Sequence, residues 1–131
     1  MHGARVMVEQ EKAVSLLHVD EMGRGRGENG RPVPVPMLPS EVIRIETAMY
    51  LAGVSDKTIR EWAHRDGIGR QAEKHSPLHI SAPALLMKAD GQTATLERFR
   101  ASERNHPAVA FYLERSICLL EEMRCAIRLR R

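Results

Sequence analysis

Cysteines are few, long apolar runs are missing and charge of either sign is nearly balanced in this chain of 131 residues. The two cysteines, Cys118 and Cys125, are seven apart in a segment predicted as helix. About 10 Å of helix axis separates them, too far for a disulfide within one chain, and we expect reduced, semi-buried thiols. No apolar run approaches the roughly 20 residues that span a bilayer, and the N-terminus lacks the apolar segment of a secretory signal. We therefore expect a cytoplasmic protein with no membrane partner.

The near balance of charge limits what composition can indicate about partners. Lysine and arginine number 20 against 17 aspartates and glutamates, which gives a net charge of +3 and a pI near 9.2. Such a charge is compatible with nucleic acid but does not require it. With 43% apolar residues, a chain of this length can form one compact core with appendages.

Motifs for catalysis are also missing. The sequence contains no glycine-rich phosphate loop, no Gly-x-Ser-x-Gly turn and no dense cluster of histidine, cysteine and acidic residues. His75 and His79 are four apart, but Pro77 between them prevents the helical placement that a metal-binding pair needs. We therefore predict no enzyme activity, no cofactor and no metal site.

The stretch from residue 51 to residue 62 predicts a helix end, a tight turn and a second helix. Gly53 follows a small apolar run, and glycine takes the left-handed conformation that ends a helix without steric cost, so the first helix ends at Ala52. Ser55 can accept a hydrogen bond from an early N–H of the next helix. Asp56 places negative charge in the first turn, where the helix dipole favours it, so the second helix begins there.

The second helix is predicted to have one apolar face and one polar face. Ile59 and Trp62 are three apart and share a face with the turn residue Val54. This apolar face packs toward the first helix. A polar and partly basic face is left outside, formed by Lys57, Arg60, Glu61 and His64.

The neighbouring elements are short and are separated by turn residues. They are an extended or strand-like entry at 42–45, a first helix from Glu46 or Thr47, a hairpin with strands at 68–71 and 78–80, and a further helix capped by Ser81. This order of helix, turn, helix, hairpin and helix predicts a mainly α fold with a small β-hairpin over residues 41–90.

Residues 1–40 are predicted as a flexible N-terminal arm and linker, with one short helix at 9–17. From residue 21 onward the composition turns to glycine, arginine and proline, which cannot bury a core. Repeated prolines favour an extended second half. We therefore expect the ordered domain to begin near Glu41.

Residues 91–131 are predicted as a C-terminal helical extension. A short charged helix at 95–103 precedes Asn105, which caps a long helix that Pro107 opens and that ends at about Leu129. Apolar residues recur along it at spacings of three and four, and the candidate oligomerisation residues among them are Leu113, Ile117, Leu120 and Ile127. This stripe packs either on the core of the domain or on the same helix of a second chain.

From Ile43 to Met87 the chain resembles the winged helix-turn-helix DNA-binding domain of phage-type excisionases, MerR-like regulators and some small terminase subunits. The segments that carry the resemblance are Ile43-Arg44-Ile45-Glu46, Gly53-Val54-Ser55, Thr58-Ile59-Arg60-Glu61-Trp62 and Ile80-Ser81-Ala82-Pro83-Ala84-Leu85. The run from Ile43 to Met87 covers roughly a third of the chain, and the order and spacing of the four segments make the combination more specific than any one of them.

The resemblance implies that the helix from Asp56 to His64 enters the major groove of double-stranded DNA. The residues that it places toward bases or phosphates are Ser55, Lys57, Thr58, Arg60 and His64. Arg60 is the best candidate for a guanine contact. The hairpin supplies phosphate contacts from Arg70, Lys74, His75 and His79. His79 stands where the family commonly has arginine, so its contact is expected to be weaker.

The run Gly23-Arg24-Gly25-Arg26-Gly27 loosely resembles the minor-groove arms called AT-hooks. Arginine gains from the negative potential of a narrow minor groove, which makes Arg24 and Arg26 candidates for such contacts. The proline that normally follows the core is absent here, and a solvated linker is the alternative.

The resemblance predicts a sequence-specific DNA-binding protein that acts as a homo-oligomer. It would act either as an excisionase that shapes DNA for a recombinase or as a regulator of transcription. Against DNA binding, acidic side chains nearly cancel the basic charge of the segment: Asp56, Glu61, Asp66 and Glu73. The alternatives are an antiactivator-like module that docks a protein through the C-terminal helix, and a small terminase subunit.

Overall fold

The computed structural model describes residues 32–130. One compact unit comprises Pro34–Arg131. The predicted helix at 9–17 and the candidate minor-groove residues Arg24 and Arg26 lie outside the described residues.

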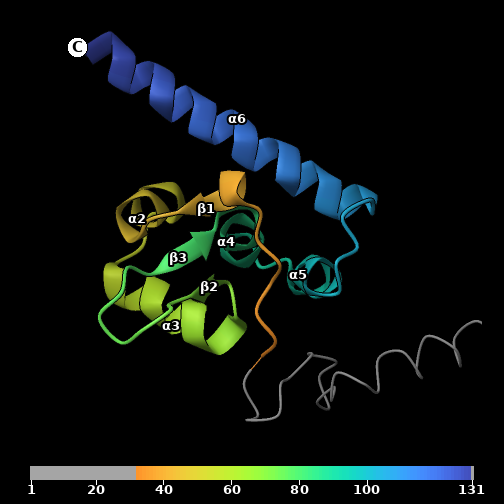
Figure 1. Cartoon of the computed structure of the whole chain (residues 1–131). Helices are drawn as coiled ribbons and strands as arrows, with labels where there is room; N and C mark the ends of the chain where they lie inside the picture. Colours follow the sequence, from red (N-terminus) through yellow and green to blue (C-terminus); the bar gives the residue numbers. More distant parts are fainter. Residues whose placement is uncertain (1–31, 131) are drawn as a thin grey trace, which may run out of the picture. The chain divides into compact units, whose positions relative to one another are not determined.

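The described part of the chain is mainly helical and contains one small antiparallel sheet (Figure 1). In chain order the elements are the single 3-10 turn η1 (Pro39–Glu41), β1 (Val42–Ile43), α2 (Ile45–Ala52), α3 (Asp56–Asp66), β2 (Gly69–Arg70), β3 (His79–Ser81), α4 (Ala82–Ala89), α5 (Thr93–Arg100) and α6 (Pro107–Arg130). This order confirms the predicted mainly α class with a small amount of β structure. None of these helices combines the length and the apolar content that crossing a membrane requires.

The turn between α2 and α3 forms where the sequence predicts it. Gly53 has a left-handed φ of 67°, and its N–H donates to the carbonyl oxygen of Met49, which ends α2. Ser55 caps α3, because its Oγ accepts a hydrogen bond from the N–H of Thr58 at 3.3 Å. The end of α2 and the start of α3 are confirmed, while α2 begins at Ile45, slightly earlier than predicted.

The sheet has three strands rather than the two of the predicted hairpin. β3 lies in the middle, where Ile80 faces Ile43 of β1 on one side and Gly69 of β2 on the other. Gly69 is needed for the packing of β2 on α3, since a Cβ at this position would lie only 2.9 Å from the Cβ of Ala63. β2 is shorter than the predicted strand at 68–71, β3 has the predicted length but begins one residue later, and the extended entry before α2 supplies the third strand.

α4 is the central element of the core. Ser81 caps it as predicted, with its Oγ accepting from the N–H of Ala84 at 3.3 Å. All residues from 82 to 87 are buried, and α4 contacts α2, β3, α5 and α6. A helix that is apolar and buried on all sides can only lie inside a folded unit.

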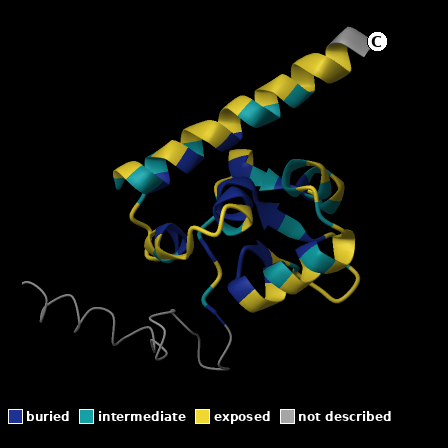
Figure 2. Ribbon diagram, turned by 180° about the vertical axis from the view of Figure 1, so that it is seen from behind, coloured by how far each residue is buried: buried dark blue, intermediate teal, exposed yellow. Residues whose placement is uncertain are grey.

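α5 and α6 complete the same core. Phe99 of α5 is fully buried, as are Val109 and most of Tyr112 in the first half of α6. Figure 2 shows buried positions on that half of α6, whereas its C-terminal part extends past the rest of the unit and is exposed. The predicted boundary after residue 90 therefore falls inside the compact unit.

Two local predictions before α6 are wrong. α5 spans Thr93–Arg100 rather than 95–103, and its buried residues reach the core from that earlier start. The residue that caps the start of α6 is His106 and not Asn105, because the imidazole Nδ1 of His106 accepts a hydrogen bond from the N–H of Ala108 at 3.2 Å.

The predicted semi-buried position of the cysteines is also wrong. Cys118 and Cys125 are free and exposed. The buried residues of α6, Val109, Tyr112 and Ser116, recur at spacings of three and four and define its inner face. At 100° per residue, the two cysteines fall on the opposite face of the helix.

The proline-rich segment before η1 belongs to the core rather than to a linker. Val35 is only 3% exposed, and its N–H donates to the carbonyl oxygen of Gly67 at 3.0 Å. Ordered structure therefore begins before Glu41, the start that composition predicts. Proline excludes this segment from a helix, but it does not prevent a side chain between two prolines from packing.

A bidentate ion pair joins η1 to the loop between α5 and α6. Two guanidinium nitrogens of Arg104 donate to the two carboxylate oxygens of Glu41, each at 2.8 Å. The N–H of Leu38 donates to the same carboxylate at 3.1 Å. Burial of the carboxyl favours its neutral form, but the hydrogen bonds from Arg104 and Leu38 outweigh this effect and lower the pKa of Glu41.

Glu41→Gln will lower the free energy of unfolding by about 2 kcal/mol at pH 7, a typical value for hydrogen bonds to a charged group. The folded-state pKa of Glu41 lies below its ordinary value of 4.5. Its stabilising contribution is therefore complete above that value and disappears as the pH falls through the folded-state pKa. Urea unfolding at pH 7 and in successively more acidic buffers will show the difference between the two proteins closing in acid.

Glu122→Gln is the matched control, because Glu122 is exposed on α6. It will leave stability nearly unchanged at every pH. A deficit in Glu41→Gln that persists undiminished at low pH would contradict the role given to the ionised carboxylate.

Candidate nucleic-acid interface

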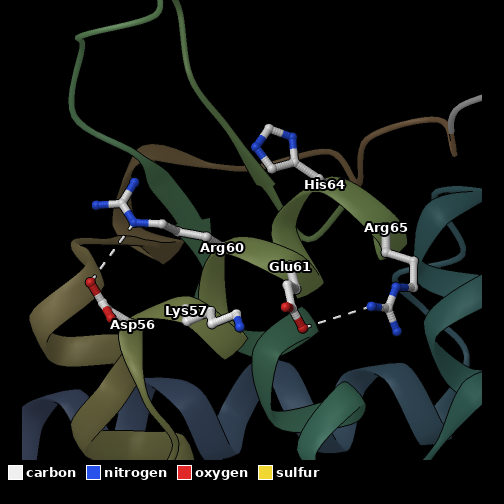
Figure 3. Close-up of a pocket in the computed structure, with 6 residues that line it drawn as sticks. All are labelled: Asp56, Lys57, Arg60, Glu61, His64 and Arg65. Atoms are coloured by element: carbon white, nitrogen blue, oxygen red, sulfur yellow. Dashed lines mark ion pairs between the residues drawn. The ribbon is translucent and has the colours of Figure 1, made fainter.

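α3 exposes a polar face on the side turned away from the core (Figure 3). Ile59 and Ala63 are buried and Trp62 is partly buried, as the helical period requires for a helix packed on one side. The outer face borders an open concavity of about 630 Å³. The side chains that line it are those of Asp56, Lys57, Arg60, Glu61, His64 and Arg65.

Two ion pairs along this face are loose. Arg60 Nε lies 4.0 Å from Asp56 Oδ2, and Arg65 Nη2 lies 3.7 Å from Glu61 Oε2, with all four side chains about half exposed or more (Figure 3). Exposed pairs of this spacing contribute only about 0.3–0.5 kcal/mol each. Both arginines can therefore exchange their carboxylate partner for an external anion at little cost.

Contacts at the C-terminal end of α3 fix the orientation of the helix. The nearly buried Asp66 side chain lies 3.2 Å from Lys88 Nζ of α4. Arg100 Nη2 of α5 donates to the carbonyl oxygen of Asp66 at 2.7 Å. Lys88 Nζ also lies 5.8 Å from the ring centre of Trp62, which packs against the core as an anchor. These contacts with α4 and α5 fix the position of α3 and therefore of its outer face.

The loop between β2 and β3 carries the other predicted contact residues. Lys74 and His75 are exposed in it. The side-chain amide of Gln71 donates to the carbonyl oxygen of Lys74 at 3.2 Å and to a further carbonyl oxygen of the loop. Arg70 is exposed in β2, opposite the partly buried His79 of β3. The loop is thus tied internally, with its cationic residues outside.

A second concavity, of about 400 Å³, lies between the start of α2, α3 and this loop. It brings together three of the predicted residues, Arg60, Lys74 and His75. Arg44 and Glu46 also line it. The sequence assigns no role to these two, because their approach to the loop depends on the pairing of β1 with β3.

The remaining predicted residues are placed differently. The hydroxyls of Ser55 and Thr58 lie 3.1 Å apart and hydrogen bond to each other, while Ser55 also caps α3. Of the two concavities, Lys57 and His64 line the outer one of α3 and not the one next to the loop. Arg70 and His79 line neither of the two concavities.

The candidate oligomerisation residues divide into two pairs. Leu113 and Leu120 are partly buried and pack against the core. Ile117 and Ile127 are 50% and 53% exposed. Much of the apolar stripe of α6 is therefore used within the chain, and its exposed remainder extends along the C-terminal half of the helix.

These features define a mainly helical protein with a small sheet and a polar surface of mixed charge that is shared by one helix and one β-loop. Between residues 32 and 130, no group of three or more histidine, cysteine, aspartate or glutamate side chains is placed to hold a metal ion. No family model, curated protein or solved structure matches the chain.

Proposed function

We propose that the protein is a winged helix-turn-helix protein that binds double-stranded DNA, with α3 in the major groove and the β2–β3 loop as the wing. The observation that carries this proposal is the concavity that α3 and the loop share, where Arg60, Lys74 and His75 gather. The turn at Gly53 and the antiparallel pairing of β2 with β3 support it. A helix held by the core, beside a loop that exposes Lys74 and His75, suits base contacts from the helix and phosphate contacts from the loop.

The proposed roles follow from the position of each residue. Arg60 lies in the middle of the exposed face of α3 and reaches base edges, since bidentate arginine is the commonest specific contact with guanine. Lys57 stands one turn earlier on the same face. Lys74 and His75 contact phosphates, which set the register of the protein on the duplex without reading sequence.

Two biological roles are consistent with this mode of binding. In an excisionase-like role, several copies would lie along the duplex and bend it for a recombinase. In the other, a dimer would regulate transcription from a two-fold symmetric site. Both require contact between copies, for which the exposed residues Ile117 and Ile127 of α6 are available.

A titration into a labelled pool of random duplexes, followed by fluorescence anisotropy at several salt concentrations, tests DNA binding. We expect a Kd below about 10 µM at low salt that weakens steadily as salt rises, because phosphate contacts release counterions. Absence of binding in this range would overturn the proposal, as would binding that does not respond to salt. Arg115→Ala, on the exposed side of α6, is the control and will bind like the unaltered protein.

The second candidate is a protein-interaction module that docks a partner through α6. The exposed apolar side chains Phe111, Ile117 and Ile127 of α6 favour it, since they are available for contact with a partner. A small terminase subunit would combine a DNA-binding α3 with assembly into a ring. Light scattering distinguishes the interaction module from the terminase subunit, since only the terminase subunit requires an oligomer of the size of a ring.

A further inference from the structure

Arg44 and Lys74 approach the concavity between α2 and the wing from two different elements. Each is exposed, and neither side chain forms a hydrogen bond or an ion pair with any residue in the described range 32–130. Arg60, the third cation of the lining, has a single ion-pair contact among the described residues, the loose one with Asp56. Cations gathered in a concavity without close carboxylate partners favour an anionic ligand.

The backbone on both sides of this concavity is fixed. Arg44 follows β1, whose Ile43 pairs with Ile80, and the carbonyl oxygen of Arg44 accepts the hydrogen bond from the N–H of Ala48 at 3.0 Å. On the other side, the amide of Gln71 ties the wing loop together. Because neither wall must be ordered on binding, little conformational entropy is lost when a ligand bridges them.

The charge of the lining suits a backbone phosphate, and its volume of about 400 Å³ leaves room for one. Three permanent cations and His75 face a single carboxylate, that of Glu46. Arg60 lines both concavities, so a duplex seated on the outer face of α3 brings its sugar-phosphate backbone to this one.

We propose that Arg44 is a ligand of a DNA backbone phosphate, and that one strand of the duplex crosses the concavity between α2 and the wing. This inference rests on the proposed function and adds a contact outside the helix and the wing. Such a contact raises the affinity for every sequence equally, because the phosphate carries no base identity.

Arg44→Ala will weaken duplex binding by about eightfold in 0.1 M salt. One phosphate contact contributes about 0.9 to the slope of log affinity against log salt, which amounts to about eightfold over the tenfold range from 1 M to 0.1 M. The slope itself will fall by about 0.9. The loss will be the same for a selected site and for random duplexes. Arg44→Lys keeps the charge and will retain most of the slope. Anisotropy titrations across a salt series measure the affinity, its salt slope and the difference between selected and random duplexes.

Glu46→Gln provides a test in the opposite direction. It removes the one carboxylate of the lining and will strengthen binding severalfold, a result that misfolding cannot produce. Arg98→Ala is the matched control for Arg44→Ala, because Arg98 is an exposed arginine on α5. It will leave the affinity for duplex unchanged. The fluorescence of the single tryptophan, Trp62, reports that each variant is folded.

The outcomes separate this inference from the proposed function. If the unaltered protein binds duplexes but Arg44→Ala binds equally well with the same salt slope, the phosphate contact is overturned and DNA binding stands. A loss confined to the selected site would assign Arg44 to base reading instead and would also overturn it. If Arg44→Ala loses binding of inorganic phosphate but binds duplexes as well as the unaltered protein does, free phosphate and not the duplex is the ligand. If the unaltered protein binds no duplex, both proposals fail.

Discussion

Arg60→Ala will reduce the preference for a selected DNA site over random duplex by about fivefold to 150-fold, the effect of losing about 1–3 kcal/mol of base discrimination. Arg60 is half exposed at the centre of the outer face of α3, and its only ion-pair contact in the described region is the 4.0 Å approach to Asp56. Its guanidinium is therefore free to reach a base. Selection from a random pool gives the preferred site, and competition titrations then measure the ratio of the two affinities.

Arg65→Ala is the matched control on the same helix. Arg65 has the same kind of loose pair one turn further along, with Glu61, but it does not line the concavity next to the wing. Its removal will leave the ratio nearly unchanged. Equal losses on selected and random duplexes in Arg60→Ala would show a phosphate contact and would contradict the reading role.

Phe99→Ala will lower the free energy of unfolding by about 3–5 kcal/mol, the usual cost of truncating a buried phenylalanine. Phe99 is fully buried, and the guanidinium carbon of Arg104 lies 5.2 Å from its ring centre. Because α5 and α6 share one core with α2 to α4, the whole unit will unfold in one transition at a lower denaturant concentration. Trp62 fluorescence reports on α3 and circular dichroism on all helices, so the two signals must coincide.

Phe111→Ala is the control for this variant, since Phe111 is 55% exposed on α6. It will change stability by less than about 0.5 kcal/mol, as surface substitutions usually do. Loss of the α5 and α6 helical signal while the Trp62 signal persists would contradict the single core and favour a separate C-terminal region.

The elements around α3 are predictable because their causes are local. Gly53 ends α2 through its own backbone freedom, and Ser55 and Ser81 cap α3 and α4 through contacts three residues away. The buried positions of α3 follow from its period of 3.6 residues. Sequence neighbours contain all of this information, so both helix starts and the exposed polar face could be placed correctly.

Features that depend on distant partners could not be predicted. Val35 is buried because Gly67 accepts its N–H, and Glu41 is held by Arg104, 63 residues later. Composition alone makes the segment around Val35 a linker. Arg44 likewise gains significance only when the wing loop comes beside it.

The apolar stripe of α6 shows the same limit in another form. Its spacing predicts that it needs a partner, but the choice between the chain's own core and a second copy depends on where the helix lies. Leu113 and Leu120 pack against the core, whereas Ile117 and Ile127 are about half exposed. The first pair is therefore used within the chain, and the second pair stays a candidate contact between copies.

The central claim is that the face formed by α3 and the wing binds duplex DNA. Amide chemical shifts of isotope-labelled protein, recorded while duplex is added, test it most directly. We predict that the largest changes will fall on residues 56–66 and 70–77, with Arg44 among the next, and that residues 107–130 will change little. Changes concentrated on α6, or none at duplex concentrations well above 10 µM in low salt, would contradict the claim.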